Sequence, residues 1–120
     1  IVIQPFGRMR HPTAQAMQII SAIDVKPLLD SHIVYLLDVR LHEELEEAAL
    51  AGALHIPLHE LPARHGELPR DKPIAVICHH GVRSQTAARF LDQAGFVDAM
   101  SIDGGIDAWS LAVDPALPRY

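Results

Sequence analysis

The sequence predicts an α/β fold built on a five-stranded parallel sheet that is covered by helices. Five short apolar runs alternate with segments of helical pattern along the 120 residues, as expected for parallel strands joined by helical crossovers. The runs are unbroken, which suits strands that are buried on both faces. Hydrophobic residues make up 49% of the chain and charged residues 21%, a composition typical of a globular domain.

The predicted strands are short and evenly distributed. They lie at Met17 to Ile20, Val34 to Leu37, Ala53 to Ile56, Ile74 to Ile77 and Ala99 to Ile102. After the first strand, Ser21 and Asp24 resemble a capping box for a helix that runs to about Asp30. Pro27 is unfavourable inside that helix, although it would fall in the first turn if Asp24 were the cap.

Two more helices and one connection are predicted from local signals. Residues 42–50 read as a short helix with acidic residues near its start, where the helix dipole favours them. Residues 60–73 contain three prolines and one glycine, which indicates a surface connection. The strongest helical pattern covers residues 84–94, with Ser84 as its cap and Gly95 closing it.

Charge and hydropathy exclude several classes of partner. The formal net charge is −5 and no window is rich in Lys and Arg, so a nucleic-acid partner is not expected. No apolar run approaches the roughly 20 residues of a bilayer span, and the opening residues lack the apolar core of a signal peptide. One cysteine forms no internal disulfide, which fits a reducing compartment. We therefore expect a cytoplasmic protein with one domain over residues 14–120, after a poorly defined extension over residues 1–13.

The single cysteine, Cys78, lies between a predicted strand and the strongest predicted helix. This arrangement aims several backbone N–H groups at one point above the sulfur, and such a cup binds anions. The helix dipole and Arg83 both favour the thiolate, which is the nucleophilic form. Gly81 permits the backbone angles that let the amides converge. A free cysteine is often an inert core residue, but that role needs neither the glycine nor the arginine, so a reactive site is favoured.

Five segments resemble motifs of the rhodanese family of sulfurtransferases, and they occur in the family's order. The segments are ISAID, LLDVRLHEEL, GALHIPL, CHHGVRS and IDGGIDAW. The resemblance runs from about Ile20 to the C-terminus. It implies a doubly wound, five-stranded parallel sheet with helices on both faces. It also implies that Cys78 is the catalytic nucleophile and that the loop amides from His79 to Ser84 cradle a persulfide on it.

The resemblance further implies the reaction and its partners. A sulfane sulfur moves from a donor such as thiosulfate to cyanide or a thiol through the Cys78 persulfide, without a metal or an organic cofactor. A protein sulfur acceptor is a further candidate partner. The residues expected to bind substrate are His79, His80, Gly81, Val82, Arg83, Ser84 and Arg40.

Two other functions share the same cysteine loop. Phosphatases and arsenate reductases that resemble this family place Arg after five intervening residues, whereas four separate Cys78 from Arg83. The shorter loop suits a sulfur atom better than a tetrahedral phosphate or arsenate. A non-enzymatic module that carries or senses persulfide sulfur would need the same loop as a sulfurtransferase, so this alternative stays open.

Other polar residues are interpreted as mainly structural. His55, His59, His79 and His80 do not follow zinc spacings with paired cysteines, so no metal site is expected. Asp38, Arg40 and Glu44 are interpreted as scaffolding with an Arg40–Glu44 pair, although Arg40 is also a candidate for attracting an anionic donor at the rim.

The last motif is interpreted as a turn and a packed helix. Gly104 and Gly105 are expected to form the turn, and Trp109 is expected to pack the following helix onto the sheet.

Overall fold

The computed structural model describes residues 17–120, so the predicted extension over residues 1–13 lies outside the described part. Its strands are β1 (Gln18–Ile20), β2 (Tyr35–Asp38), β3 (Leu54–His55), β4 (Ile74–Ile77) and β5 (Met100–Ile102). They form one sheet in the order β1-β5-β4-β2-β3, and all pairs are parallel. The predicted five-stranded parallel sheet is therefore confirmed, and each strand overlaps the apolar run that predicted it.

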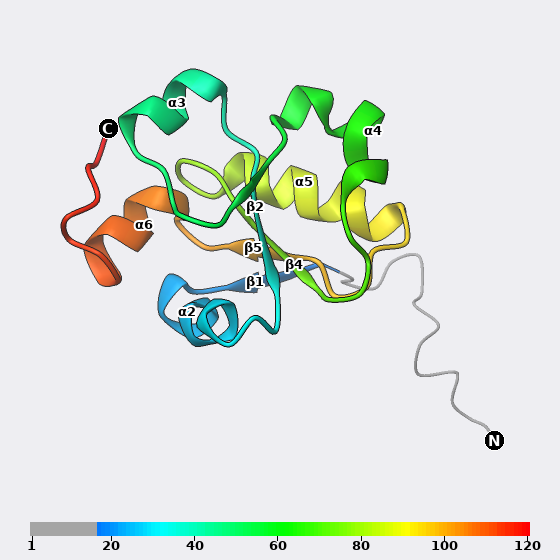
Figure 1. Cartoon of the computed structure of the whole chain (residues 1–120), viewed down its shortest axis with the longest axis horizontal. Coiled ribbons are helices and arrows are strands. Elements are labelled where there is room, and N and C mark those ends of the chain that lie inside the picture. The colour runs from blue at the N-terminus through cyan, green and yellow to red at the C-terminus, as the bar shows by residue number, and fades with distance from the viewer. Residues whose placement is uncertain (1–16) are drawn as a thin grey trace.

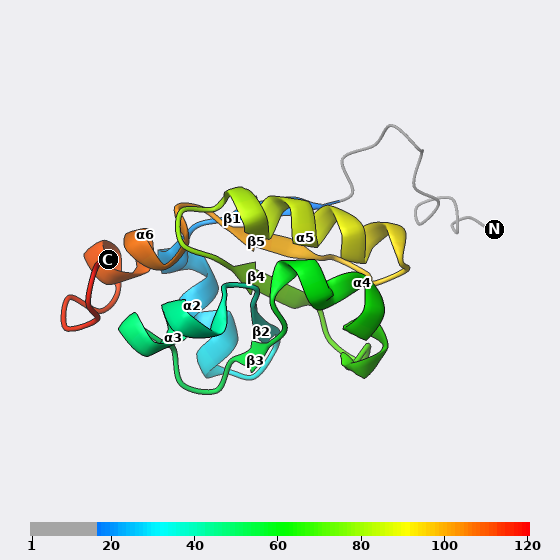
Figure 2. The same cartoon turned by 90° about the horizontal axis from the view of Figure 1, so that it is seen from above.

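Helices cover both faces of this sheet, which confirms the doubly wound architecture (Figures 1 and 2). α2 (Ala22–Asp30) and α6 (Gly105–Ala112) lie on one face, while α4 (Leu61–Arg64) and α5 (Val82–Gln93) lie on the other. Each face has its own buried cluster, one including Leu61, Ala87, Ala88 and Leu91 and the other including Ala22, Val25, Ile106 and Trp109. Trp109 packs α6 onto the sheet, as the sequence predicts.

The helix after β4 starts earlier than predicted. Its N-cap is Gly81, whose φ of 105° is in the left-handed region. Ser84 is therefore the third residue of α5 and not its cap. The helix ends at Gln93 and is followed by Gly95 with φ of 95°, which agrees with the predicted closure. The early start shortens the loop after Cys78 and brings the first turn of α5 closer to the sulfur.

Two other predicted helices can be compared with the structure. Ser21 caps α2 through a 3.0 Å bond that its hydroxyl accepts from the Asp24 amide, and Pro27 lies inside that helix. The helix predicted over residues 42–50 is shorter, since α3 (His42–Glu47) ends before Ala48.

The segment predicted as a surface connection is partly helical. It contains α4, flanked by the 3-10 turns η1 (Leu58–Glu60) and η2 (His65–Glu67). Pro62 is tolerated because it lies in the first turn of α4, where its missing N–H has no partner within the helix. Leu61 and Leu68 are buried and fold the segment against the sheet. Over residues 17–120, no helix has both the length and the apolar character that crossing a bilayer requires.

Candidate active site at the carboxyl end of β4

Cys78 follows β4, the central strand of the sheet, at its carboxyl end. Open parallel α/β sheets bind ligands at this edge. The loop from β4 to α5 lies at the same end of the molecule as α3, α6 and the C-terminus (Figures 1 and 2). Cys78 is only 1% exposed, so its sulfur lies beneath the loop instead of projecting into solvent.

Two main-chain amides converge on the Cys78 sulfur. The N–H of Gly81 donates to Sγ at 3.1 Å and the N–H of Ser84 donates at 3.3 Å. The thiol in turn donates to the Ser84 hydroxyl at 3.4 Å. The first turn of α5 also directs the positive end of its dipole toward this point. The loop therefore forms a binding site for one negative charge on the sulfur.

The start of α6 orients this loop from the other side. The amide of Ile106 donates to the carbonyl of Cys78 at 2.8 Å, and the amide of Asp107 donates to the carbonyl of His79 at 3.2 Å. Gly105 makes this approach possible, because a Cβ there would collide with both carbonyl oxygens. With its carbonyls bonded to α6, the loop turns its amides toward the sulfur.

A pair of buried hydroxyls supports the loop from β5. Ser84 Oγ lies 2.7 Å from Ser101 Oγ and donates to the Gly81 carbonyl at 3.1 Å. Both serines are 0% exposed. Ser101 was not predicted from the sequence, although a lone hydroxyl in an otherwise apolar run (Ala99 to Ile102) was a usable signal.

Arg83 forms an ion pair with Glu44 of α3 through both of its terminal nitrogens. The two N–O distances are 2.6 and 2.8 Å. The hydrogen bonds from Arg83 lower the pKa of Glu44 to about 2, and those same bonds raise the pKa of Arg83. The predicted Arg40–Glu44 pair is therefore wrong, since Arg40 reaches only the main-chain oxygen of Glu44, at 3.4 Å.

Arg40 is completely buried and serves as a structural link. Its guanidinium contacts the Asp38 carboxylate at 2.7 Å and the Ala48 carbonyl at 2.7 Å. It also donates to the Tyr120 hydroxyl at 2.9 Å. With 0% of its surface exposed, Arg40 lies below the rim, so this geometry favours the scaffold interpretation over donor binding.

The aromatic ring of Tyr120 covers His79. His79 is stacked between Tyr120 and His80, with ring centroids 3.9 and 3.8 Å apart. The Tyr120 hydroxyl donates to Glu44 at 2.8 Å, and burial raises the pKa of Tyr120 to about 12. Tyr120 was not predicted as part of the site, because it lies 41 positions beyond His79 and no local pattern connects the two.

The remaining loop residues face outward. Val82 is 75% exposed and His80 is also exposed. In the described part of the chain, no group of three or more His, Cys, Asp and Glu side chains is placed to hold a metal ion. His55 instead contacts the main-chain oxygen of Arg40 through Nε2 at 2.7 Å.

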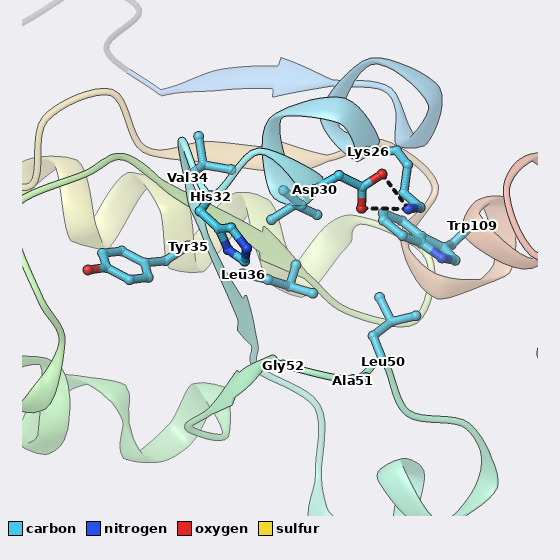
Figure 3. Close-up of a pocket in the computed structure, with 11 residues that line it drawn as sticks. Lys26, Asp30, His32, Val34, Tyr35, Leu36, Leu50, Ala51, Gly52 and Trp109 are labelled. Carbon is cyan, nitrogen blue, oxygen red and sulfur yellow. Dashed lines mark hydrogen bonds and ion pairs between the residues drawn. The ribbon is translucent and has the colours of Figure 1, made fainter.

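A separate groove lies beside α2 and β2 (Figure 3). Figure 3 shows the Lys26–Asp30 ion pair at its edge, with Trp109 and Leu50 nearby. None of the residues that line this groove belongs to the loop from Cys78 to Ser84, so the groove is not part of the site around the sulfur.

Comparisons with known proteins agree with this geometry. Residues 21–112 match the family model described as Rhodanese-like domain. A sulfurtransferase of Allochromatium vinosum is 35% identical over 83 residues, which are 69% of this chain and 78% of that protein. The thiosulfate sulfurtransferase GlpE of Coxiella burnetii is 32% identical over 90 residues, 75% of this chain and 84% of that protein. A crystal structure of a rhodanese-related protein from Thermoplasma volcanium, 36% identical, superposes with a TM-score of 0.73 over 84% of this chain and 95% of that one.

Proposed function

We propose a persulfide mechanism for this protein, starting from the premise that the chain belongs to the rhodanese-like domain family of sulfurtransferases. Its relatives support sulfur transfer in general. The observation that carries the proposal is the pair of amides of Gly81 and Ser84 on the Cys78 sulfur. A cytoplasmic location would keep this thiol reduced.

In the first step, the Cys78 thiolate attacks the sulfane sulfur of a donor such as thiosulfate. A new S–S bond forms on Cys78, the donor's own S–S bond breaks, and sulfite leaves with the electron pair. The amides favour the thiolate before the attack and the anionic persulfide after it. Removal of one comparable preorganised donor in an enzyme site costs about 3 kcal/mol of transition-state stabilisation.

In the second step, cyanide or a thiol attacks the outer sulfur of the persulfide. The bond between the two sulfurs breaks, and Cys78 returns as the thiolate. This sequence divides one transfer into two steps through a covalent intermediate. His79 and His80 belong to the loop and are proposed to face the acceptor.

A persulfide carrier is the second candidate function, because it needs the same loop as a sulfurtransferase. A Bacillus subtilis relative that is 36% identical over 105 residues has a name that describes a sulfur carrier protein. Phosphoryl transfer is less well supported, because only four residues separate Cys78 from Arg83.

Mass spectrometry of the intact protein tests the proposal. Incubation with a sulfane sulfur donor should add the mass of one sulfur atom, and cyanide should then remove it as thiocyanate. Cys78→Ser should show neither event, while Ser110→Ala, which changes a hydroxyl on α6 outside the loop, should show both. Loading without turnover to cyanide or small thiols would favour the carrier. Absence of loading in the wild-type protein would refute both functions.

A further inference from the structure

Glu44 neutralises the positive charge of Arg83, the arginine in the Cys78 loop. Arg83 gives two hydrogen bonds to the Glu44 carboxylate, and the exposed fractions of the two side chains are 33% and 17%. The pair therefore lies at the rim of the site and carries no net charge. Arg83 is also adjacent to Ser84, whose amide contacts the sulfur.

The second arginine near the loop is neutralised in the same way. Arg40 is paired with the Asp38 carboxylate at 2.7 Å and is fully buried. On the other side of the loop, Asp107 is paired with Arg119 at 2.7 Å. The positive electrostatic potential at the sulfur therefore comes from the two amides and from the N-terminus of α5. These groups can balance one negative charge.

We propose that Glu44 determines donor specificity by cancelling the charge of Arg83, so that the site prefers singly charged sulfane sulfur donors to dianionic thiosulfate. This inference rests on the proposed sulfur transfer and names the class of donor for it. A dianion brings a second negative charge to a rim where Arg83, paired with Glu44, has no uncompensated positive charge to balance it. A monoanion brings only the charge that the amides accept.

Thiosulfate and methanethiosulfonate form a matched pair of donors for this question. Both present a terminal sulfane sulfur, and they differ by one anionic oxygen replaced by a methyl group. In each case the Cys78 thiolate forms an S–S bond with that sulfur as the donor's S–S bond breaks. The electron pair leaves with sulfite or with methanesulfinate, and the same persulfide remains. The ratio of kcat/KM for thiosulfate to that for methanethiosulfonate therefore reports the response to donor charge.

The test measures this ratio with cyanide as acceptor in wild-type protein and in charge variants. Glu44→Gln should raise the ratio roughly fivefold to tenfold at low salt, the size expected for one unit charge at a partly solvated site. Arg83→Gln should lower it by a similar factor, and the double variant should return toward the wild-type ratio. Glu43→Gln removes the same charge from the exposed neighbour on α3 and should leave the ratio nearly unchanged.

A salt titration compares the wild-type protein with Glu44→Gln. In Glu44→Gln the uncompensated Arg83 should attract the dianion, so added salt should lower the ratio relative to wild type by screening that attraction, whereas Glu43→Gln should follow wild type. A Glu44→Gln ratio with the salt dependence of wild type, or a Glu44→Gln effect no larger than that of Glu43→Gln, would overturn the inference while leaving sulfur transfer intact. Failure of both donors to load Cys78 would instead refute the proposed function.

Discussion

Two arginine–carboxylate pairs lie near the carboxyl ends of neighbouring strands, yet their surroundings differ. The Asp38–Arg40 pair follows β2 and is 1% and 0% exposed. The Glu44–Arg83 pair links α3 to the cysteine loop and is 17% and 33% exposed. The pair that excludes water links parts of the structure, whereas water reaches the pair at the rim.

The physical reason for this difference is desolvation. Arg40 has given up water, and the carboxylate, carbonyl and hydroxyl that surround it replace its hydration. Removal of one partner leaves an uncompensated buried charge. Arg83 can exchange its partner for water at little cost. Tyr120 joins the two pairs, because its hydroxyl accepts from Arg40 and donates to Glu44.

The largest effect on stability is expected at the buried pair. Arg40→Gln should lower the free energy of unfolding by about 3–5 kcal/mol, because Asp38 loses its partner in the protein interior. Arg83→Gln should change it by at most about 1 kcal/mol, as is typical of partly exposed ion pairs. Urea denaturation with unchanged m-values measures both. Equal losses in the two variants would show that burial does not distinguish the two pairs.

The second-largest effect on stability is expected for the contact between Gly105 and the loop that contains Cys78 and Arg83. Gly105→Ala should cost about 1–3 kcal/mol through overpacking, because its Cβ meets the carbonyl oxygens of Cys78 and His79. Sulfur loading should also fall at equal folded fraction, since the loop must shift. Gly52→Ala is the matched control: its φ is also positive, at 81°, but no heavy atom lies within 4 Å of the new Cβ. Normal loading in Gly105→Ala would show that α6 does not position the loop.

The third effect is the pH dependence of stability that the Glu44–Arg83 ion pair should contribute. The pKa of Glu44 is lowered from 4.5 to about 2, chiefly by Arg83. Its stabilising contribution is therefore complete above pH 4.5 and is lost as the pH falls toward about 2. Thermal unfolding of wild type and Glu44→Gln should converge over this range, whereas Glu43→Gln should remain parallel to wild type. A constant difference between wild type and Glu44→Gln would contradict the assignment.

The smallest effect on stability is expected for the Tyr120 hydroxyl, which joins the two ion pairs. Tyr120→Phe should destabilise the protein by about 1 kcal/mol, because Arg40 loses an acceptor and Glu44 loses a donor. Tyr35→Phe removes a hydroxyl that contacts Asp71 at the surface, so its effect should be smaller. Chemical denaturation of both variants measures the difference. A larger loss in Tyr35→Phe would show that the bridging hydroxyl contributes little.

Much of the fold and the centre of the site could be predicted because they depend on local properties of the chain. The apolar runs predicted all five strands, since burial on both faces requires unbroken hydrophobic segments. The position of Cys78 at a strand end predicted converging amides, and Gly81 predicted a left-handed turn, which the structure shows with φ of 105°. The start of α5 was misplaced because Ser84 has the side chain of a helix cap but bonds to the sulfur and Ser101 instead.

The sheet, the strand-end cysteine and the glycine turn follow from the sequence alone, because hydrophobic periodicity and backbone freedom are encoded by neighbouring residues. Long-range packing, in contrast, selects the carboxylate that each arginine binds. Glu44 lies four positions after Arg40 but binds Arg83, 39 positions away, and Tyr120 reaches Glu44 from 76 positions away. The order of the strands places the carboxyl ends of β2 and β4 side by side, so charged groups find their partners across strands.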